Sequence, residues 1–281
     1  MKEITVLTHQ RPDDTAATLR LLAERAERAG FRLRLSKEES EKHDLPAGPG
    51  VERDAPLQRD VALCVVLGGD GTILRALQEY ASTEVPVFAI NFGEIGFLAT
   101  VERDDEGTGI DRALAGDFEL LRLPGIVVEL DGERRVAIND VAVHRKVGER
   151  VAELAYALDG EEVGSVRCDG LVVATPAGST GYNLANGGPV MAWGVEGFVV
   201  SFIAPHSMTA RALVVAPDDR LTVHNNSREP LDVAIDGRPV GQIPAGEAIA
   251  ASFFSDCATL AQLPGTSFYR RLRDKFGRLA S

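Results

Sequence analysis

The chain has 281 residues, of which 44% are hydrophobic and 26% are charged. This length is typical of about two domains, and the composition supports a buried core, which excludes disordered, fibrous and small disulfide-stapled proteins. Thirty basic and 42 acidic side chains leave a formal net charge of −12. The electrostatic field of the whole protein therefore does not favour nucleic acid or an anionic membrane as a partner, although the net charge does not exclude a local basic pocket.

Cysteine usage and hydropathy indicate a cytoplasmic protein. The three cysteines, Cys64, Cys168 and Cys257, are widely spaced and form no CxxC motif, so we expect no disulfide framework and no zinc site. The N-terminus is too short and polar for a signal peptide. The most apolar stretch, 190–205, is interrupted by Glu196 and two glycines, which argues against a membrane span.

The first third of the chain alternates between strand and helix patterns. Residues 4–7 predict a short buried strand, and Asp13-Asp14 then cap a helix that ends near Ala29. Residues 31–35 alternate as a strand does. Residues 36–58 are charged and contain Pro and Gly, so we expect a mobile surface loop.

A second strand–helix–strand pattern follows. Residues 61–67 form a continuous apolar run, typical of a parallel strand that is buried on both faces. A glycine-rich turn at 68–72 leads into a helix from Ile73, and residues 85–90 predict another buried strand. This alternation indicates an α/β domain with an open parallel sheet over residues 1–122.

From about residue 120 the pattern changes to many short apolar runs separated by turn signals such as Asp131-Gly132, Asp159-Gly160 and Asp236-Gly237. Such spacing predicts an all-β, sandwich-like domain over residues 123–264. Residues 265–281 predict a closing helix that packs back on the protein. The expected strands are 125–130, 136–143, 151–158, 171–174, 197–203, 221–223, 231–235 and 248–254.

The turn Gly68-Gly69-Asp70-Gly71-Thr72 lies where open α/β sheets bind ligands, at the carboxyl end of a strand. Its glycines let a phosphate approach the backbone, and the helix N-terminus supplies N–H groups. A carboxylate repels phosphate, so Asp70 makes chemical sense if it takes a proton from an attacking hydroxyl or holds a metal ion. The alternative is a tight turn with Asp70 as the helix cap.

Two better-known phosphate motifs are absent. The sequence contains no GxxxxGK[ST], and His9-Gln10-Arg11-Pro12, not GxGxxG, follows the first strand. If the protein binds a dinucleotide, this absence favours the dinucleotide as a substrate.

A second set of polar groups lies in the β-rich part. The hydroxyls and glycines of 175–182 can surround an anion or a sugar, and Tyr182 can stack on a base. Asn139-Asp140 can contact a base edge and a ribose diol. The alternatives are a connection between strands and a simple turn. Any polyphosphate needs local positive charge, for which the candidates, each also readable as a surface charge, are Arg75, Arg150, Arg167 and Arg238.

Seven segments occur in the order in which NAD kinases carry them. They are GGDGT at 68–72, ND at 139–140, RCDG at 167–170, TPAGSTGY at 175–182, NGGPV at 186–190, APHS at 204–207 and RALV at 211–214. The chain therefore resembles the NAD kinase family over nearly its whole length. GGDGT is shared with lipid kinases, whereas the TPxGST(A/G)Y…GGP segment is far more specific.

The resemblance implies that Asp70 accepts the proton of the 2′-hydroxyl on the adenosine ribose of NAD, while ATP donates its γ-phosphate and NADP forms. It implies Mg²⁺ or another divalent cation bound through the nucleotide phosphates, and a homodimer or homotetramer. The positions implied to bind the nucleotides are Gly68, Gly69, Gly71, Thr72, Arg75, Asn139, Asp140, Arg150, Arg167, Asp169, Thr175, Gly178, Ser179, Thr180, Gly181, Tyr182, Asn183, Leu184, Ala185, Asp236 and Arg238.

Three departures from the family pattern concern specificity. Asp140 replaces the commoner Glu and is one methylene shorter, Ala177 replaces Thr, and Gly181 replaces Ala. A diacylglycerol-type lipid kinase remains an alternative because it shares GGDGT, and a non-catalytic NAD-binding regulator is another. Inorganic polyphosphate as the donor and NADH as the acceptor also stay open.

Overall fold

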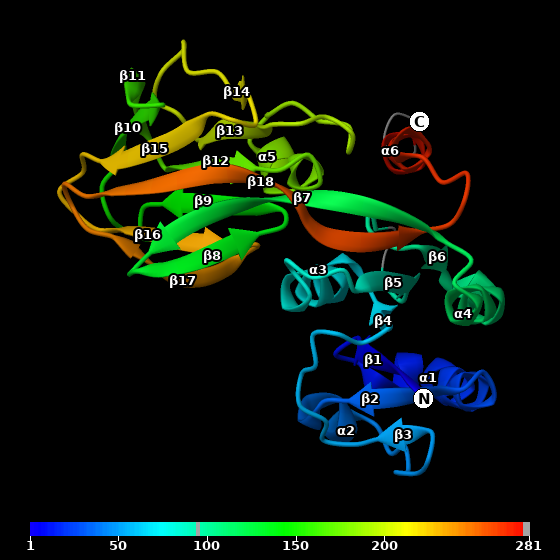
Figure 1. The fold of residues 1–281 in the computed structure, drawn as a ribbon. Coiled ribbons are helices and arrows are strands. Elements are labelled where there is room, and N and C mark those ends of the chain that lie inside the picture. The colour runs from blue at the N-terminus through cyan, green and yellow to red at the C-terminus, as the bar shows by residue number, and fades with distance from the viewer. Residues whose placement is uncertain (94–95, 278–281) are drawn as a thin grey trace. The chain divides into compact units, whose positions relative to one another are not determined.

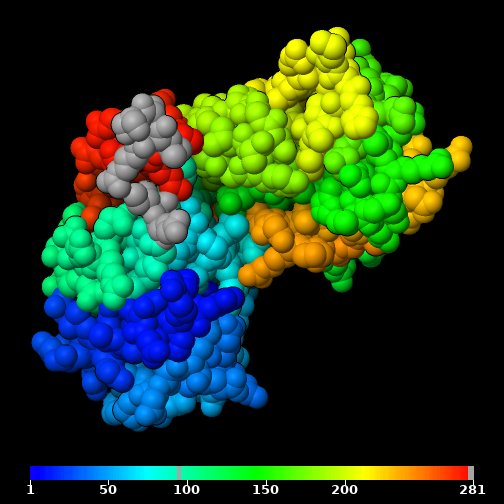
Figure 2. All heavy atoms as spheres, turned by 180° about the vertical axis from the view of Figure 1, so that it is seen from behind, coloured from blue at the N-terminus to red at the C-terminus, as the bar shows by residue number. Residues whose placement is uncertain are grey.

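The computed structural model describes residues 1–93 and 96–277. The chain forms two compact units, each with its own core: unit 1 is Met1–Arg122 with Ala258–Ser281, and unit 2 is Leu123–Cys257 (Figure 1). The red C-terminal segment thus belongs with the blue and cyan N-terminal residues (Figure 2). Residues 258–264, which the sequence pattern assigns to the β-rich domain, pack in unit 1 because strand β18 (Ala248–Gln262) continues into its sheet.

Unit 1 contains the predicted open parallel sheet. Its strands lie in the order β5-β4-β1-β2-β3, all parallel, with the end of β18 beside β5. The strand order reverses between β1 and β4, which is where open α/β sheets bind ligands. The strands are β1 (Lys2–Thr8), β2 (Phe31–Leu35), β3 (Val51–Glu52), β4 (Leu63–Gly68), β5 (Pro86–Asn91) and β6 (Val101–Glu102).

Helix α1 (Pro12–Arg28) follows the first strand, as predicted, but Asp13 and Asp14 do not cap it. Pro12 occupies the first helical turn and Arg11 is the cap residue, without a side-chain bond. The two aspartates lie inside the first turn, where their negative charge interacts favourably with the helix dipole and stabilises the helix. The other helices of unit 1 are α2 (Lys37–Lys42), α3 (Asp70–Glu79), the 3₁₀ turn Arg103–Asp105, α4 (Glu106–Ala115) and α6 (Phe268–Phe276).

The prediction of a mobile loop at 36–58 is wrong. The segment contains α2 and β3, and Glu39 and Ser40 in α2 are buried. The Ser36 side chain caps α2 by accepting from the Glu39 amide at 3.2 Å. Charged residues can form an ordered segment here because a buried Glu39 carboxylate accepts hydrogen bonds from Thr8 and Lys42.

Unit 2 is built from two antiparallel sheets, in agreement with the predicted β-rich fold. One sheet has the order β14-β13-β12-β9-β16-β17, and the other contains β11-β10-β15-β18 with the β7–β8 hairpin. Apolar side chains from both sheets form a single core. The strands are β7 (Glu119–Leu130), β8 (Glu133–Ala137), β9 (Asp140–His144), β10 (Ala152–Leu158), β11 (Glu161–Cys168), β12 (Gly170–Ala174), β13 (Phe198–Ile203), β14 (Leu213–Val215), β15 (Arg220–Asn225), β16 (Leu231–Ile235) and β17 (Arg238–Ile243).

The predicted Asp-Gly turns close hairpins with both residues at positive φ, for example 55° at Asp131 and 76° at Gly132. The run 136–143 is two strands, β8 and β9, because the backbone turns away at Ile138–Asn139. Helix α6 begins at Phe268 with Ser267 as its cap, as the closing-helix prediction requires. Residues 278–281 of that prediction lie outside the described residues. None of the helices in 1–93 and 96–277 is long and apolar enough to cross a bilayer.

Candidate active site

The glycine-rich turn follows β4, a strand with every residue buried, and begins α3. Gly69 is the cap residue, so Asp70 is the first helical residue and not the helix cap. The Asp70 carboxylate accepts the Phe97 amide at 2.8 Å and the Leu98 amide at 3.1 Å. The side chain is thereby held in one orientation at the N-terminus of a ten-residue helix, where the helix dipole favours negative charge.

Glycines around Asp70 are required by close backbone approach. A Cβ on Gly93 would lie 2.9 Å from the Gly69 Cα, and a Cβ on Gly96 would lie 2.1 Å from the Asp70 Oδ1. Residue 93 and residues 96–98 are therefore the second half of this site, and they were not predicted from the sequence. The signal for them was Gly93 and Gly96 following the buried strand that lies next to β4.

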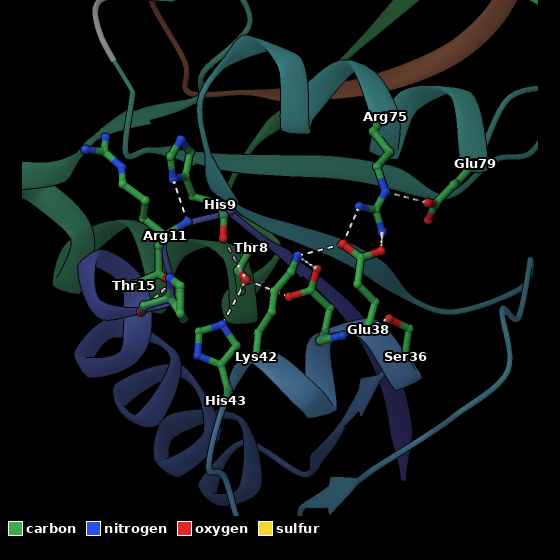
Figure 3. Close-up of polar contacts among 12 residues, drawn as sticks. Thr8, His9, Arg11, Thr15, Ser36, Glu38, Lys42, His43, Arg75 and Glu79 are labelled. Carbon is green, nitrogen blue, oxygen red and sulfur yellow. Dashed lines mark hydrogen bonds and ion pairs between the residues drawn. The ribbon is translucent and has the colours of Figure 1, made fainter. Parts of the chain in front are cut away.

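The other predicted residues in and after this turn differ in burial and in their contacts. Gly68 is buried against Thr72, whose Cβ would lie 2.7 Å from an added Cβ, whereas Gly71 is exposed at the helix start. The Arg75 guanidinium is bound by both Glu38 oxygens, at 2.9 and 2.7 Å, and by Glu79 at 3.0 Å (Figure 3). Hydrogen bonds from Arg75 and then Lys42 lower the pKa of Glu38 to about 2, so this ion pair ties α3 to α2.

Unit 2 has its own pocket of about 460 Å³ on the sheet of order β14-β13-β12-β9-β16-β17. Three predicted residues line it: Asp140, Asp169 and Tyr182. Its floor is apolar, with Ala142 and Ala234 from adjacent strands. A sugar or base of a nucleotide fits such a mixture of apolar floor and convergent polar groups. The other lining residues are His144, Arg145, Val147, Gly148, Ile203 and Gly237.

The Asn139-Asp140 turn is held from the far hairpin by Asp236. The two carboxylate oxygens of Asp236 accept hydrogen bonds from the backbone amides of Ile138 at 2.9 Å, Asn139 at 2.7 Å and Asp140 at 3.0 Å. Asp236 therefore builds the turn. From the other side, the Thr175 hydroxyl donates to the Ile138 carbonyl at 2.7 Å.

Asp140 presents a buried carboxylate to the pocket. Burial, and then the charge of Asp236, raise the pKa of Asp140 to about 7. No side chain or amide within the described residues donates to this carboxylate, and the buried Asn139 Oδ1 likewise has no partner there. Buried polar atoms are normally hydrogen-bonded, so this turn offers unmet acceptors to a ligand that carries hydroxyl and amino groups.

Asp169 is paired with Arg145, a residue that was not predicted. Arg145 donates to both Asp169 oxygens, at 2.6 and 3.2 Å, and this bond lowers the pKa of Asp169. The signal for Arg145 was a cation directly after the strand that begins with Asp140. Arg150, Arg167 and Arg238 are exposed, and none of them lines the pocket.

The 175–185 segment divides into residues that build the loop and residues that face outward. Thr175, Ser179 and Asn183 are fully buried and bond to backbone groups of 138, 176, 189 and 191. Gly178 allows close packing, since a Cβ there would lie 2.0 Å from the Asn139 carbonyl oxygen. Tyr182 is 42% exposed at the pocket. Outside the core of the loop lie Thr180, Gly181, Leu184 and Ala185.

A glycine-rich turn at the carboxyl end of a parallel strand and a pocket with an apolar floor and convergent polar groups are both typical of the class of nucleotide-binding proteins. Residues 17–118 match the family model described as ATP-NAD kinase N-terminal domain, and residues 138–253 match the ATP-NAD kinase C-terminal domain. The chain belongs to the ATP-NAD kinase family.

Individual relatives agree with this assignment. The chain is 34% identical to an NAD kinase of Gemmatimonas aurantiaca, with 82% of this chain and 81% of that protein covered. It is 33% identical to NAD kinase 2 of Streptomyces avermitilis over 98% of this chain and 94% of that protein. An NAD kinase from Archaeoglobus fulgidus in complex with ATP has a TM-score of 0.76 at 26% identity, covering 100% of this chain and 99% of that chain. The yeast NADH kinase complexed with NADH has the same fold, with a TM-score of 0.88 at 20% identity, covering 100% of this chain and 89% of that chain.

Proposed function

We propose that this protein transfers the γ-phosphoryl group of ATP to the 2′-hydroxyl of the adenosine ribose of NAD, giving ADP and NADP. The observation that supports this most is the Asp70 carboxylate at the end of β4, held by two backbone amides in a chain of this family. In this proposal Asp70 orients the 2′-hydroxyl and accepts its proton, while the attacking oxygen bonds to the γ-phosphorus and the bond to the ADP oxygen breaks.

Unit 2 holds the adenosine part of NAD in this proposal. The Asn139 Oδ1 is a buried acceptor without a partner among the described residues and suits an amino group, the Asp140 carboxylate lines the pocket and suits a ribose diol, and Tyr182 offers a ring for stacking. Because Asp140 is one methylene shorter than the commoner Glu, three outcomes stay open for its contact with the ribose: a direct bond, a bond through a water, or no contact. In unit 1, backbone N–H groups at the start of α3 donate to phosphate oxygens and offset part of the phosphate charge.

We further propose that a divalent cation such as Mg²⁺ reaches the site with the donor phosphates. The part of the chain that the structure describes contains no group of three or more His, Cys, Asp or Glu that could hold an ion alone. Mg²⁺ is typically held by one or two carboxylates and the substrate phosphates. Asp70 would fit as such a carboxylate, because each of its oxygens accepts one amide and has further lone pairs, so that one oxygen would contact the cation while the other accepts the proton. When bound, the cation neutralises phosphate charge.

The test is a coupled assay that detects NADP with ATP, NAD and Mg²⁺. General-base catalysis contributes about 10²- to 10⁴-fold, so Asp70→Asn is expected to lower kcat at least about 100-fold while NAD still binds. Asp60→Asn, which changes an exposed aspartate of unit 1, is the matched control and should keep wild-type kcat. Near-wild-type turnover in Asp70→Asn would refute the role of Asp70.

The same assay addresses the other candidate activities. A non-catalytic NAD-binding regulator would be stabilised by NAD without consuming ATP. The lipid kinase is not favoured, since both family models that match are those of ATP-NAD kinases. Replacing ATP by inorganic polyphosphate, or NAD by NADH, defines the donor and the acceptor.

The remaining proposals concern assembly and compartment. We infer a homodimer or homotetramer in the cytoplasm. The three cysteines are buried and free, as in a reducing compartment. Sedimentation velocity measures the oligomeric state.

A further inference from the structure

The C-terminal helix α6 of unit 1 packs on the residue that holds Asp70. The Phe97 ring packs against two aromatic rings of α6, with its centroid 6.3 Å from that of Phe268 and 6.2 Å from that of Phe276. The Lys275 amine lies 4.2 Å from the Phe97 ring centroid, within cation–π distance. Phe97 is only 5% exposed, so α6 covers this side chain.

Arg271 extends this packing to the backbone of the same residue. Its Nη1 donates to the Phe97 carbonyl at 2.7 Å, and its Nη2 donates to the Gln262 Oε1 at 2.6 Å. Gln262 is the last residue of β18, whose end is part of the parallel sheet. The guanidinium therefore ties the 96–98 segment to the rigid sheet through two bonds with a fixed fork geometry.

The two ends of residue 97 thus have different partners. Its carbonyl is held by Arg271, and its N–H donates to the Asp70 Oδ2 at 2.8 Å. The next amide, of Leu98, holds the Oδ1. Any shift of this short segment moves both donors of the Asp70 carboxylate together. Gly96 leaves no spare room, since a Cβ there would collide with the Oδ1.

We infer that Arg271 is a positioning residue for phosphoryl transfer: through the Phe97 peptide it fixes the two amides that orient the Asp70 carboxylate. This inference rests on the proposed function of Asp70. Arg271 acts through Phe97 and is not proposed to touch the substrate. The positive charge of Arg271 suits its surroundings, which include the carboxylates of Asp70 and Glu102. Burial lowers the pKa of Arg271, and the negative charges of Asp70 and Glu102 oppose that shift.

The experiment compares three variants of the full chain in the NADP-forming assay. Arg271→Met removes both bonds but keeps a long side chain, and Arg271→Lys keeps the charge and an ammonium group that can donate to the Phe97 carbonyl. Arg273→Met is the matched control, because the Arg273 side chain is 74% exposed and pairs only with its neighbour Asp274 among the described residues. Melting temperatures are measured in parallel.

A misplacement of about 1 Å costs up to about 100-fold in rate, so Arg271→Met should lower kcat by about 10- to 100-fold. The KM for NAD should change less than about threefold, because Arg271 does not contact NAD in this proposal. Arg271→Lys should recover kcat to within about threefold of wild type, since one donor suffices to hold the carbonyl. Arg273→Met should match wild type.

Three results would overturn the inference while leaving the proposed function intact, provided that the wild type is active. The first is an unchanged kcat in Arg271→Met, and the second is a lower melting temperature of Arg271→Met without a lower kcat. The third is a loss of kcat in Arg273→Met as large as that in Arg271→Met. An inactive wild type would instead refute the proposed function. If Arg271→Met does not fold, hydrogen exchange on the wild type decides, because the Phe97 and Leu98 amides must be protected. Exchange of either at the rate of an unstructured chain would contradict the inference.

Discussion

Three aspartates of this chain have different roles because their surroundings differ. Asp236 accepts three backbone amides and Asp70 accepts two. Asp140 is 7% exposed, and no amide or side chain of the described residues donates to its carboxylate. Amide donors stabilise the ionised form of a carboxylate, whereas burial without donors favours the protonated form. Side-chain type alone therefore does not assign a chemical role.

The Asp140 carboxylate leads to a prediction about pH. Because its pKa is about 7 in the folded protein and near 3.8 for an unperturbed aspartate, the native state binds more protons than the unfolded chain between those values. Stability without ligand should therefore fall as the pH rises from about 4 to 7. Asp140→Asn removes this cost and should raise the free energy of unfolding at pH 8 by about 2–4 kcal/mol, with little effect at pH 4.

Urea unfolding of wild type and Asp140→Asn at both pH values provides the measurement. Asp169→Asn is the control with the opposite sign. The Arg145 bond lowers the pKa of Asp169, so its charge stabilises the fold and its removal should not stabilise the protein at pH 8. Equal effects of Asp140→Asn at pH 4 and pH 8 would contradict the assignment.

At the scale of elements, α2 depends on one hydroxyl of β1. The Thr8 Oγ1 donates to the Glu39 Oε2 at 2.5 Å and lies 2.8 Å from the His43 Nε2 (Figure 3). Since the hydroxyl has one proton, which goes to Glu39, the His43 Nε2 donates to Thr8. Glu39 is fully buried, so its two oxygens need the donors that Thr8 and Lys42 supply.

Thr8→Val keeps the shape of the side chain and removes the hydroxyl. It should lower the free energy of unfolding by about 2 kcal/mol, because a buried carboxylate oxygen loses its donor. Chemical denaturation measures this effect. Thr222→Val, on a strand of unit 2 where the hydroxyl makes no bond within the described residues, should change it by less than about 0.5 kcal/mol. A Thr8→Val protein as stable as its control would show that the network adds nothing to α2.

At the scale of the whole molecule, each unit buries its own apolar core and the chain crosses between them along long strands. The core of unit 2 includes Leu171 and Phe198, both fully buried, and that of unit 1 includes Leu22 and Phe88. Leu171 lies in β12 of the sheet that carries the pocket proposed to hold the adenosine part of NAD. Ligand binding to this unit should therefore offset a defect in its core.

Leu171→Ala should cost about 3 kcal/mol, in the range measured for buried leucines. Saturation with NAD at about 100 times its Kd should add about 2.7 kcal/mol by mass action. Differential scanning calorimetry with and without NAD should thus show most of the lost melting temperature recovered. A wild-type melting temperature that does not rise with NAD would exclude the pocket as an NAD site.

Much of the fold followed from local pattern. The apolar run before Gly68 predicted a strand buried on both faces, and the Asp-Gly pairs predicted turns between short strands, because both signals depend on residues within a few positions of each other. The same applies to the Gly-Gly-Asp-Gly turn. The signal for α2 was also local, since Ser36 and Glu39 have the spacing of a capping box, but the charge of the segment concealed it.

The sequence by itself determined the parallel sheet, the β-rich half and the place of Asp70, since strand and turn preferences act over short distances. Only the tertiary structure decided which groups orient each aspartate. Asp70 is held by amides 27 and 28 residues away, and the Asn139 amide by a carboxylate 97 residues away. Backbone amides are present in nearly every residue, so no side-chain pattern marks the ones that the closed fold brings to a carboxylate.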